Sequence, residues 1–132
     1  MASVLKVLPG LFLASVPLMI VDAPAAAAAS RFDGSWNVMI VTSGGPCDRS
    51  YRFGLSIRNG DIFYDGSAPV NLNGRVSRNG SVRVRVSAGA QSADGAGRLL
   101  RDRGQGKWRG IGASGSCTGS WTAQRNWIGA SY

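Results

Sequence analysis

The stretch Arg78-Asn79-Gly80-Ser81-Val82-Arg83-Val84-Arg85-Val86-Ser87-Ala88 decides the fold of this chain. Its valines and Ala88 alternate with serine and arginine, and this period of two is typical of a β-strand with one buried face. The Asn-Gly pair in front of the strand is a strong hairpin signal, because both residues tolerate a positive φ. The stretch therefore predicts a strand over residues 81–88 that follows a tight turn.

The face alternation also predicts the geometry of that turn. A two-residue loop at Asn79-Gly80 would set an inward residue opposite an outward one. A three-residue loop over residues 78–80, with a bulge at Gly80, instead pairs Val76 with Val82 and Arg75 with Arg83.

A second Arg-Asn-Gly tripeptide, at residues 58–60, gives a different result. There a two-residue loop keeps the faces matched, since Ile57 then meets Ile62 and Arg58 meets Asp61, with Leu55 opposite Tyr64 further along. We interpret the repeated tripeptide as local turn chemistry.

Similar alternating segments, separated by Gly, Asn and Pro, extend along the rest of the chain after residue 30. Glutamate is absent, glycine is the commonest residue at 19, and no segment has the spacing of an amphipathic helix. The predicted strands are residues 35–42, 49–57, 61–65, 70–77, 81–88, 95–100, 105–111 and 116–125. The sequence thus predicts an all-β, up-and-down antiparallel meander of about eight strands, which can close into a barrel. A two-sheet sandwich is the alternative.

Cys47 and Cys117 are the only cysteines. In a closed barrel, the loop after the first strand and the start of the eighth strand lie at the same rim, so we predict a Cys47–Cys117 disulfide across the seam. Closing a loop of about 70 residues is worth roughly 4 kcal/mol in the chain-entropy model. Free thiols or half of a metal site are the alternatives, but the chain has no histidine or glutamate to complete a metal site.

Residues 1–29 have the pattern of a secretory signal peptide. Lys6 precedes an apolar stretch over residues 7–21, and an alanine run over residues 25–29 offers cleavage sites near Ala28 or Ala29. A retained anchor is the alternative, but the stretch is short for a bilayer span and contains two prolines. We expect cleavage, a single domain over residues 30–132, and a periplasmic or secreted location.

The chain is strongly basic, with 15 Lys and Arg against 7 acidic residues and a net charge of +8. Such a surface attracts polyanions, including envelope polymers. The alternative is that the arginines reflect composition and solubility. Nucleic acid is an unlikely partner, because the arginines alternate with core valines and no outward aromatic row is present for base stacking. The candidate residues for an anionic ligand are Arg58, Arg75, Arg78, Arg83, Arg85, Arg101 and Arg103.

The aromatic residues allow two interpretations. They could line a ligand pocket at a barrel mouth, or they could supply the bulk of a small core. We expect core packing, because about 103 residues leave little room for a cavity. The residues concerned are Trp36, Trp108, Trp121, Trp127, Tyr51 and Tyr64.

Catalysis and membrane insertion are not expected. Without histidine or glutamate, only aspartates remain as acid or base candidates, and most of them flank glycine or lie in predicted turns. We therefore predict no enzyme activity, cofactor or metal. A lipid-embedded barrel needs an apolar outer face, whereas here the outward positions are Arg, Ser and Asn.

Three segments resemble small secreted β-proteins encoded by alphaproteobacteria: Phe32-Asp33-Gly34-Ser35-Trp36, Cys47 with Tyr51, and Cys117-Thr118-Gly119-Ser120-Trp121-Thr122-Ala123. This resemblance covers residues 31–125 and implies bacterial export and a β-fold, without assigning a site. Gly34-Ser35-Trp36 also resembles the Gly-x-Trp opening of calycin-type barrels such as lipocalins and avidins, which bind small apolar molecules inside.

More distantly, the chain is similar to bacterial protease-inhibitor barrels of the metalloprotease-inhibitor type. This similarity implies an N-terminal strand that enters a protease cleft, with residues 29–32 at that place, although no motif matches. Two functional hypotheses follow. The first is a binding module for an anionic envelope component. The second is a protein-interaction or inhibitor barrel that acts through its rims or N-terminal arm.

Overall fold

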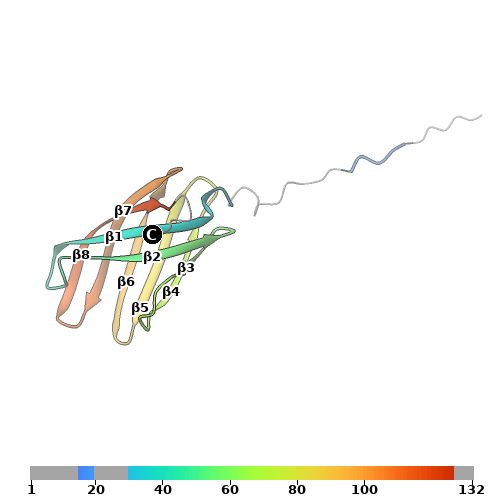
Figure 1. Cartoon of the computed structure of the whole chain (residues 1–132). Helices are drawn as coiled ribbons and strands as arrows, with labels where there is room; N and C mark the ends of the chain where they lie inside the picture. The colour runs from blue at the N-terminus through green and yellow to red at the C-terminus, as the bar shows by residue number, and fades with distance from the viewer. Residues whose placement is uncertain (1–14, 20–29, 127–132) are drawn as a thin grey trace, which may run out of the picture.

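A computed structural model describes residues 15–19 and 30–126. Residues 30–126 form a closed antiparallel barrel in which each strand pairs with its sequence neighbours and β1 pairs with β8 (Figure 1). The elements are the 3-10 helix η1 (Ser30–Phe32) and the strands β1 (Gly34–Gly44), β2 (Ser50–Arg58), β3 (Asp61–Tyr64), β4 (Asn71–Val76), β5 (Ser81–Ala88), β6 (Gln91–Leu99), β7 (Arg103–Gly112) and β8 (Gly115–Arg125). The predicted meander and its closure are confirmed, and the sandwich alternative is wrong.

Both predicted Arg-Asn-Gly turns have the expected register. Asn59 and Gly60 have φ angles of 51° and 85°, and the turn pairs Ile57 with Ile62. In the β4–β5 connection, Gly80 has a φ of 92° and Val76 pairs with Val82. These glycines and Asn59 adopt the left-handed conformation that the two loop lengths require.

Strand β6 begins at Gln91, four residues before its predicted start at Gly95. The inward positions of this part of the barrel carry alanine and glycine, so the apolar alternation that marks the other strands is missing. The small residues have a packing reason. A Cβ at Gly97 or Gly106 would lie 2.6 Å from the ring of Trp121, which therefore lies flat across β7 and β6.

Trp108 lies across the wall in the opposite direction. It pairs with Gly119 on β8, where a Cβ would lie 2.7 Å from the indole nitrogen. The same nitrogen donates a hydrogen bond to the Val41 carbonyl of β1, at 3.2 Å. The glycines of β6 to β8 thus make room for two indole rings that lie against the inner wall.

The best-packed part of the core lies at the end of the barrel next to η1, which we call the closed end. Phe32, Trp36 and Val76 are 3%, 1% and 0% exposed there. Arg125 covers this end: its guanidinium lies 4.7 Å from the Trp36 ring and donates hydrogen bonds to the carbonyls of Arg31, Asp33 and Arg101. Burial lowers the pKa of Arg125, but an arginine stays protonated in proteins.

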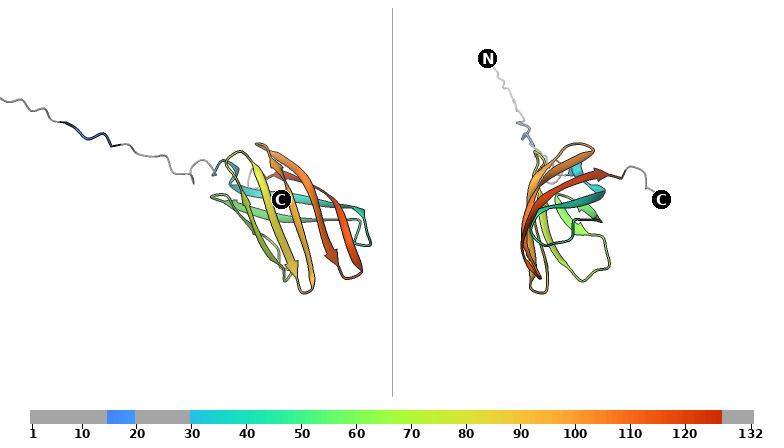
Figure 2. Two further views of the ribbon diagram at one scale, coloured as in Figure 1. Left: turned by 180° about the vertical axis from the view of Figure 1, so that it is seen from behind. Right: turned by 90° about the vertical axis from the view of Figure 1, so that its left-hand side faces the viewer.

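The opposite end, which we call the open end, carries the disulfide. Cys47 lies in the β1–β2 loop and is bonded to Cys117 of β8, so the predicted cross-link is confirmed. The views in Figure 2 show the barrel from two further sides.

The predicted cleavage sites, Ala28 and Ala29, lie outside the described residues. Among residues 15–19 and 30–126, no helix is long and apolar enough to cross a membrane.

Candidate functional site

The interior of the barrel contains a cavity of about 410 Å³. Its lower part, next to the closed end, is lined by aliphatic side chains such as Ile57, Ile62 and Leu99, and its upper part reaches Cys47 and Tyr51 at the open end. Ligand pockets in proteins have volumes of roughly 300 to 1,000 Å³ and are mostly apolar. The cavity is therefore large enough for a small ligand.

The two ends of the cavity differ in exposure. At the closed end, Ile57 and Leu99 are 2% and 5% exposed, whereas the inward-facing Tyr51 at the open end is 49% exposed. A ligand would therefore enter between the β1–β2 loop and the β5–β6 and β7–β8 turns.

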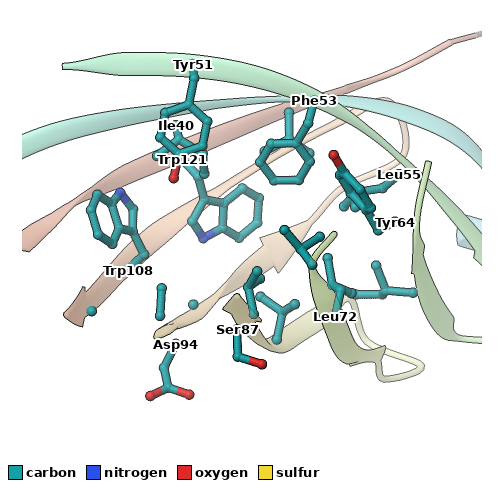
Figure 3. A pocket seen from close by; sticks show the side chains of 18 of the residues that line it. Ile40, Tyr51, Phe53, Leu55, Tyr64, Leu72, Ser87, Asp94, Trp108 and Trp121 are labelled. Carbon is teal, nitrogen blue, oxygen red and sulfur yellow. The ribbon is translucent and has the colours of Figure 1, made fainter. Parts of the chain in front are cut away.

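Aromatic rings line the upper part of the cavity from both sides of β1 (Figure 3). On β2 and β3, the ring of Phe53 lies 6.3 Å from Tyr51 and 6.1 Å from Tyr64, measured between ring centroids. On β7 and β8, Trp108 and Trp121 lie flat against the wall. Burial raises the pKa of Tyr51 above its ordinary value, with a smaller contribution from the charge of Asp48, so its hydroxyl is neutral at physiological pH.

The expectation that these aromatic residues only fill a core is wrong in part. Trp36 and Trp121 are buried, at 1% and 7% exposure, yet both also border the cavity. Trp108, Tyr51 and Tyr64 line it as well, and Trp127 lies outside the described residues. The sequence signal that could have revealed the cavity is the run of inward small residues on β6 to β8, such as Gly95 and Gly110.

The charged groups of the lining residues lie outside the cavity. Arg52 and Asp94 border the cavity, but their charged groups do not point into it. Both occupy outward positions of their strands, and Asp94 forms an ion pair with Arg85 at 2.9 Å on the outer surface. Figure 3 shows the Asp94 carboxylate pointing away from the aromatic rings. The inner wall therefore offers hydroxyl groups and π-faces but no charged group, and it contains the Trp121 indole nitrogen, which is buried and has no hydrogen-bond partner among the described residues.

The seven candidate arginines are all exposed, but they do not form one site. Four belong to the turns of the closed end: Arg58, Arg78, Arg101 and Arg103. Three lie on the outer face of β4 and β5: Arg75, Arg83 and Arg85. Several of the seven already have partners. Arg75 and Arg85 pair with Asp61 and Asp94, and Arg58 lies 4.3 Å from the Phe63 ring.

The strand register shows that further basic residues, outside the set of seven candidates, lie on this surface. Arg83 faces Arg75 on one side and Ala96 on the other, and Ala96 in turn faces Lys107 of β7. Asp94 stands between Arg85 and Arg109 in the next row. The outer face of β4 to β7 is thus a basic surface.

The residues that the structure describes contain no cluster of three or more side chains that could hold a metal ion. Both cysteines are used in the disulfide.

In comparisons with known proteins, no family model matches the chain, and no curated protein or solved structure matches it.

Proposed function

We propose that this protein is an exported, non-enzymatic binding protein that takes up a small apolar ligand in its barrel. The observation that carries the proposal is the cavity of about 410 Å³, which is apolar inside, packed shut at the closed end and accessible at the open end. The resemblance of Gly34-Ser35-Trp36 to the opening of calycin-type barrels supports the same function. The disulfide fits an oxidising location outside the cytoplasm.

Two alanines of β6 provide a matched test of the cavity. Ala93 borders the cavity, whereas Ala96 lies three residues further on, on the exposed outer face. The experiment is a titration of the exported, oxidised protein with the neutral fluorescent probe N-phenyl-1-naphthylamine. Ala93→Leu should weaken probe binding about tenfold or more, because it fills the cavity, and Ala96→Leu should leave binding unchanged. No saturable binding, or equal effects of both substitutions, would contradict the proposal.

A second candidate function is the binding of an anionic envelope polymer by the basic outer face. The observation that favours it is the direct pairing of Arg75 with Arg83, since like charges that face each other across strands are destabilising. Because Arg75 also pairs with Asp61, an anion on this face would be bound chiefly by Arg83. The neighbouring Lys107 extends the cationic row.

This candidate can be tested by salt elution from immobilised heparin and from lipopolysaccharide. The double variant Arg83→Ser and Arg85→Ser should elute at lower salt than the double variant Arg49→Ser and Arg52→Ser. Both variants lose two charges, but only the first loses them from the basic face. Equal elution shifts would mean that retention depends on net charge alone, and the candidate would then fail.

The protein-interaction or inhibitor function has less support. Phe32 is 3% exposed, its carbonyl accepts a hydrogen bond from the Trp36 indole nitrogen at 2.9 Å, and the Arg31 carbonyl is held by Arg125. Residues 31 and 32 are therefore docked on the barrel. Residue 29 lies outside the described residues.

A further inference from the structure

The two indole rings present flat faces to the cavity. The Trp121 ring covers Gly106 and Gly97, so one of its faces is against the wall and the other faces inward. The Trp108 nitrogen lies 2.7 Å from the position of a Cβ at Gly119 and donates a hydrogen bond to the Val41 carbonyl. A ligand in the cavity therefore meets the π-face of Trp108, because the polar edge of this ring is used by the protein.

A second set of rings lines the cavity on the other side of β1. Tyr51, Phe53 and Tyr64 form a continuous series with centroid distances of 6.3 and 6.1 Å. The cavity is thus aromatic on the sides of β2 and β3 and of β7 and β8, and aliphatic at Leu72 and at Leu55, which lies beside Tyr64 (Figure 3). Aromatic rings attract other aromatic rings beyond the effect of the buried area.

The electrostatics of the cavity restrict the charge of the ligand. Among the described lining residues, the charged side chains are those of Arg52 and Asp94, and both occupy outward positions. An ion in the cavity would lose its hydration without gaining a partner, which is costly. The hydroxyl of Tyr51, whose pKa burial raises above its ordinary value, can form a hydrogen bond at the open end.

We infer that the ligand is a neutral, planar aromatic or conjugated molecule that lies in the upper cavity between the indole rings and the series of Tyr51, Phe53 and Tyr64. This inference rests on the proposed function and makes it more specific. A saturated molecule of the same size would fill the volume but would gain nothing from the π-faces.

Naphthalene and decalin test the inference because they share one carbon skeleton and only naphthalene is planar and aromatic. Each is used to displace N-phenyl-1-naphthylamine from the exported, oxidised protein. Naphthalene should bind about tenfold more tightly than decalin, although decalin is the more hydrophobic molecule. Trp108→Leu should reduce this preference severalfold. Leu72→Ala should weaken the binding of both molecules alike and keep the ratio of their affinities.

The outcomes separate the inference from the function on which it rests. If decalin displaces the probe as well as naphthalene does, the protein still binds apolar molecules but the aromatic preference is wrong. If 2-naphthalenesulfonate binds the cavity as tightly as naphthalene, the requirement for a neutral ligand is wrong. If the probe does not bind, or binds without sensitivity to Ala93→Leu, the proposed function itself fails.

Discussion

At the scale of single residues, glycine and tryptophan form one structural unit in β6 to β8. The Trp121 ring lies over positions that carry no side chain. A Cβ at Gly106 would meet this ring and would also lie 2.1 Å from the Ala96 carbonyl oxygen. Gly106 therefore determines how close Trp121 lies to the wall, and so how much of the barrel interior stays empty.

This role makes Gly106→Ala destabilising. The added methyl group must displace the Trp121 ring or the β6 backbone, and such overpacking costs about 1 to 3 kcal/mol of unfolding free energy. Gly54→Ala is the control, because its Cβ would have no neighbour closer than 3.6 Å and its φ is ordinary. Urea denaturation of both variants, followed by tryptophan fluorescence, measures the difference. Equal stability of the two variants would show that the ring does not depend on the glycine.

Tyr51 gives the open end a predictable dependence on pH. Its pKa is raised in the fold above the ordinary tyrosine value of 10.0, chiefly by burial, so the folded protein holds the phenol proton more tightly than the unfolded chain does. The stabilising contribution is therefore complete below the unfolded pKa and is lost as the pH rises through the folded pKa.

Tyr51→Phe removes this group while keeping the ring. As the pH rises above about 10, the ordinary pKa of tyrosine, the unfolding free energy of the wild-type protein should fall more steeply than that of the variant. Chemical denaturation at a series of pH values gives both curves. Parallel curves would contradict the assigned environment of Tyr51.

At the scale of elements, the hairpins were predictable because the evidence for them is local. The parity of inward and outward residues around Gly60 and Gly80 gave the two loop lengths and the register of the flanking strands, and both are confirmed. The beginning of β6 was not predictable in this way. Its inward residue Gly97 is small because of Trp121, which lies more than 20 positions later in the chain.

The contribution of Gly80 in the β4–β5 turn to stability can be tested. Gly80 has a φ of 92°, and a Cβ there would lie 2.3 Å from the Leu99 carbonyl oxygen. Gly89, in the β5–β6 turn, has a φ of 63° and open space around it. Gly89→Ala should therefore cost only the conformational penalty of about 1 kcal/mol, and Gly80→Ala should cost at least about 1 to 2 kcal/mol more. Thermal or urea denaturation measures both, and equal losses would rule out the crowding at Leu99.

At the scale of the whole molecule, the barrel is asymmetric along its axis. The closed end contains η1, the Arg125 contacts and the turns with Arg58, Arg78, Arg101 and Arg103, whereas the open end contains the disulfide and the cavity entrance. The sequence predicted the positions of the turns and the cross-link, because strand order alone determines them. The small inward residues of β6 to β8 could indicate a cavity but not its volume, since an empty volume depends on the summed side-chain volumes of all eight strands and on the ring orientations of Trp108 and Trp121.

The disulfide gives the last prediction. Cys47 and Cys117 are separated by 70 residues, so their bond restricts most of the unfolded barrel. The double variant Cys47→Ala and Cys117→Ala should lose about 4 kcal/mol of unfolding free energy in the chain-entropy model. The barrel should nevertheless stay closed, because β1 and β8 are also paired from Trp36 with Arg125 to Gly44 with Thr118. Urea denaturation gives the loss of stability, and near-ultraviolet circular dichroism reports whether the tryptophans keep their packing. A loss of stability below about 1 kcal/mol would contradict the chain-entropy estimate. Loss of the near-ultraviolet tryptophan signal in the absence of urea would show that the cross-link, and not the strand pairing, closes the barrel.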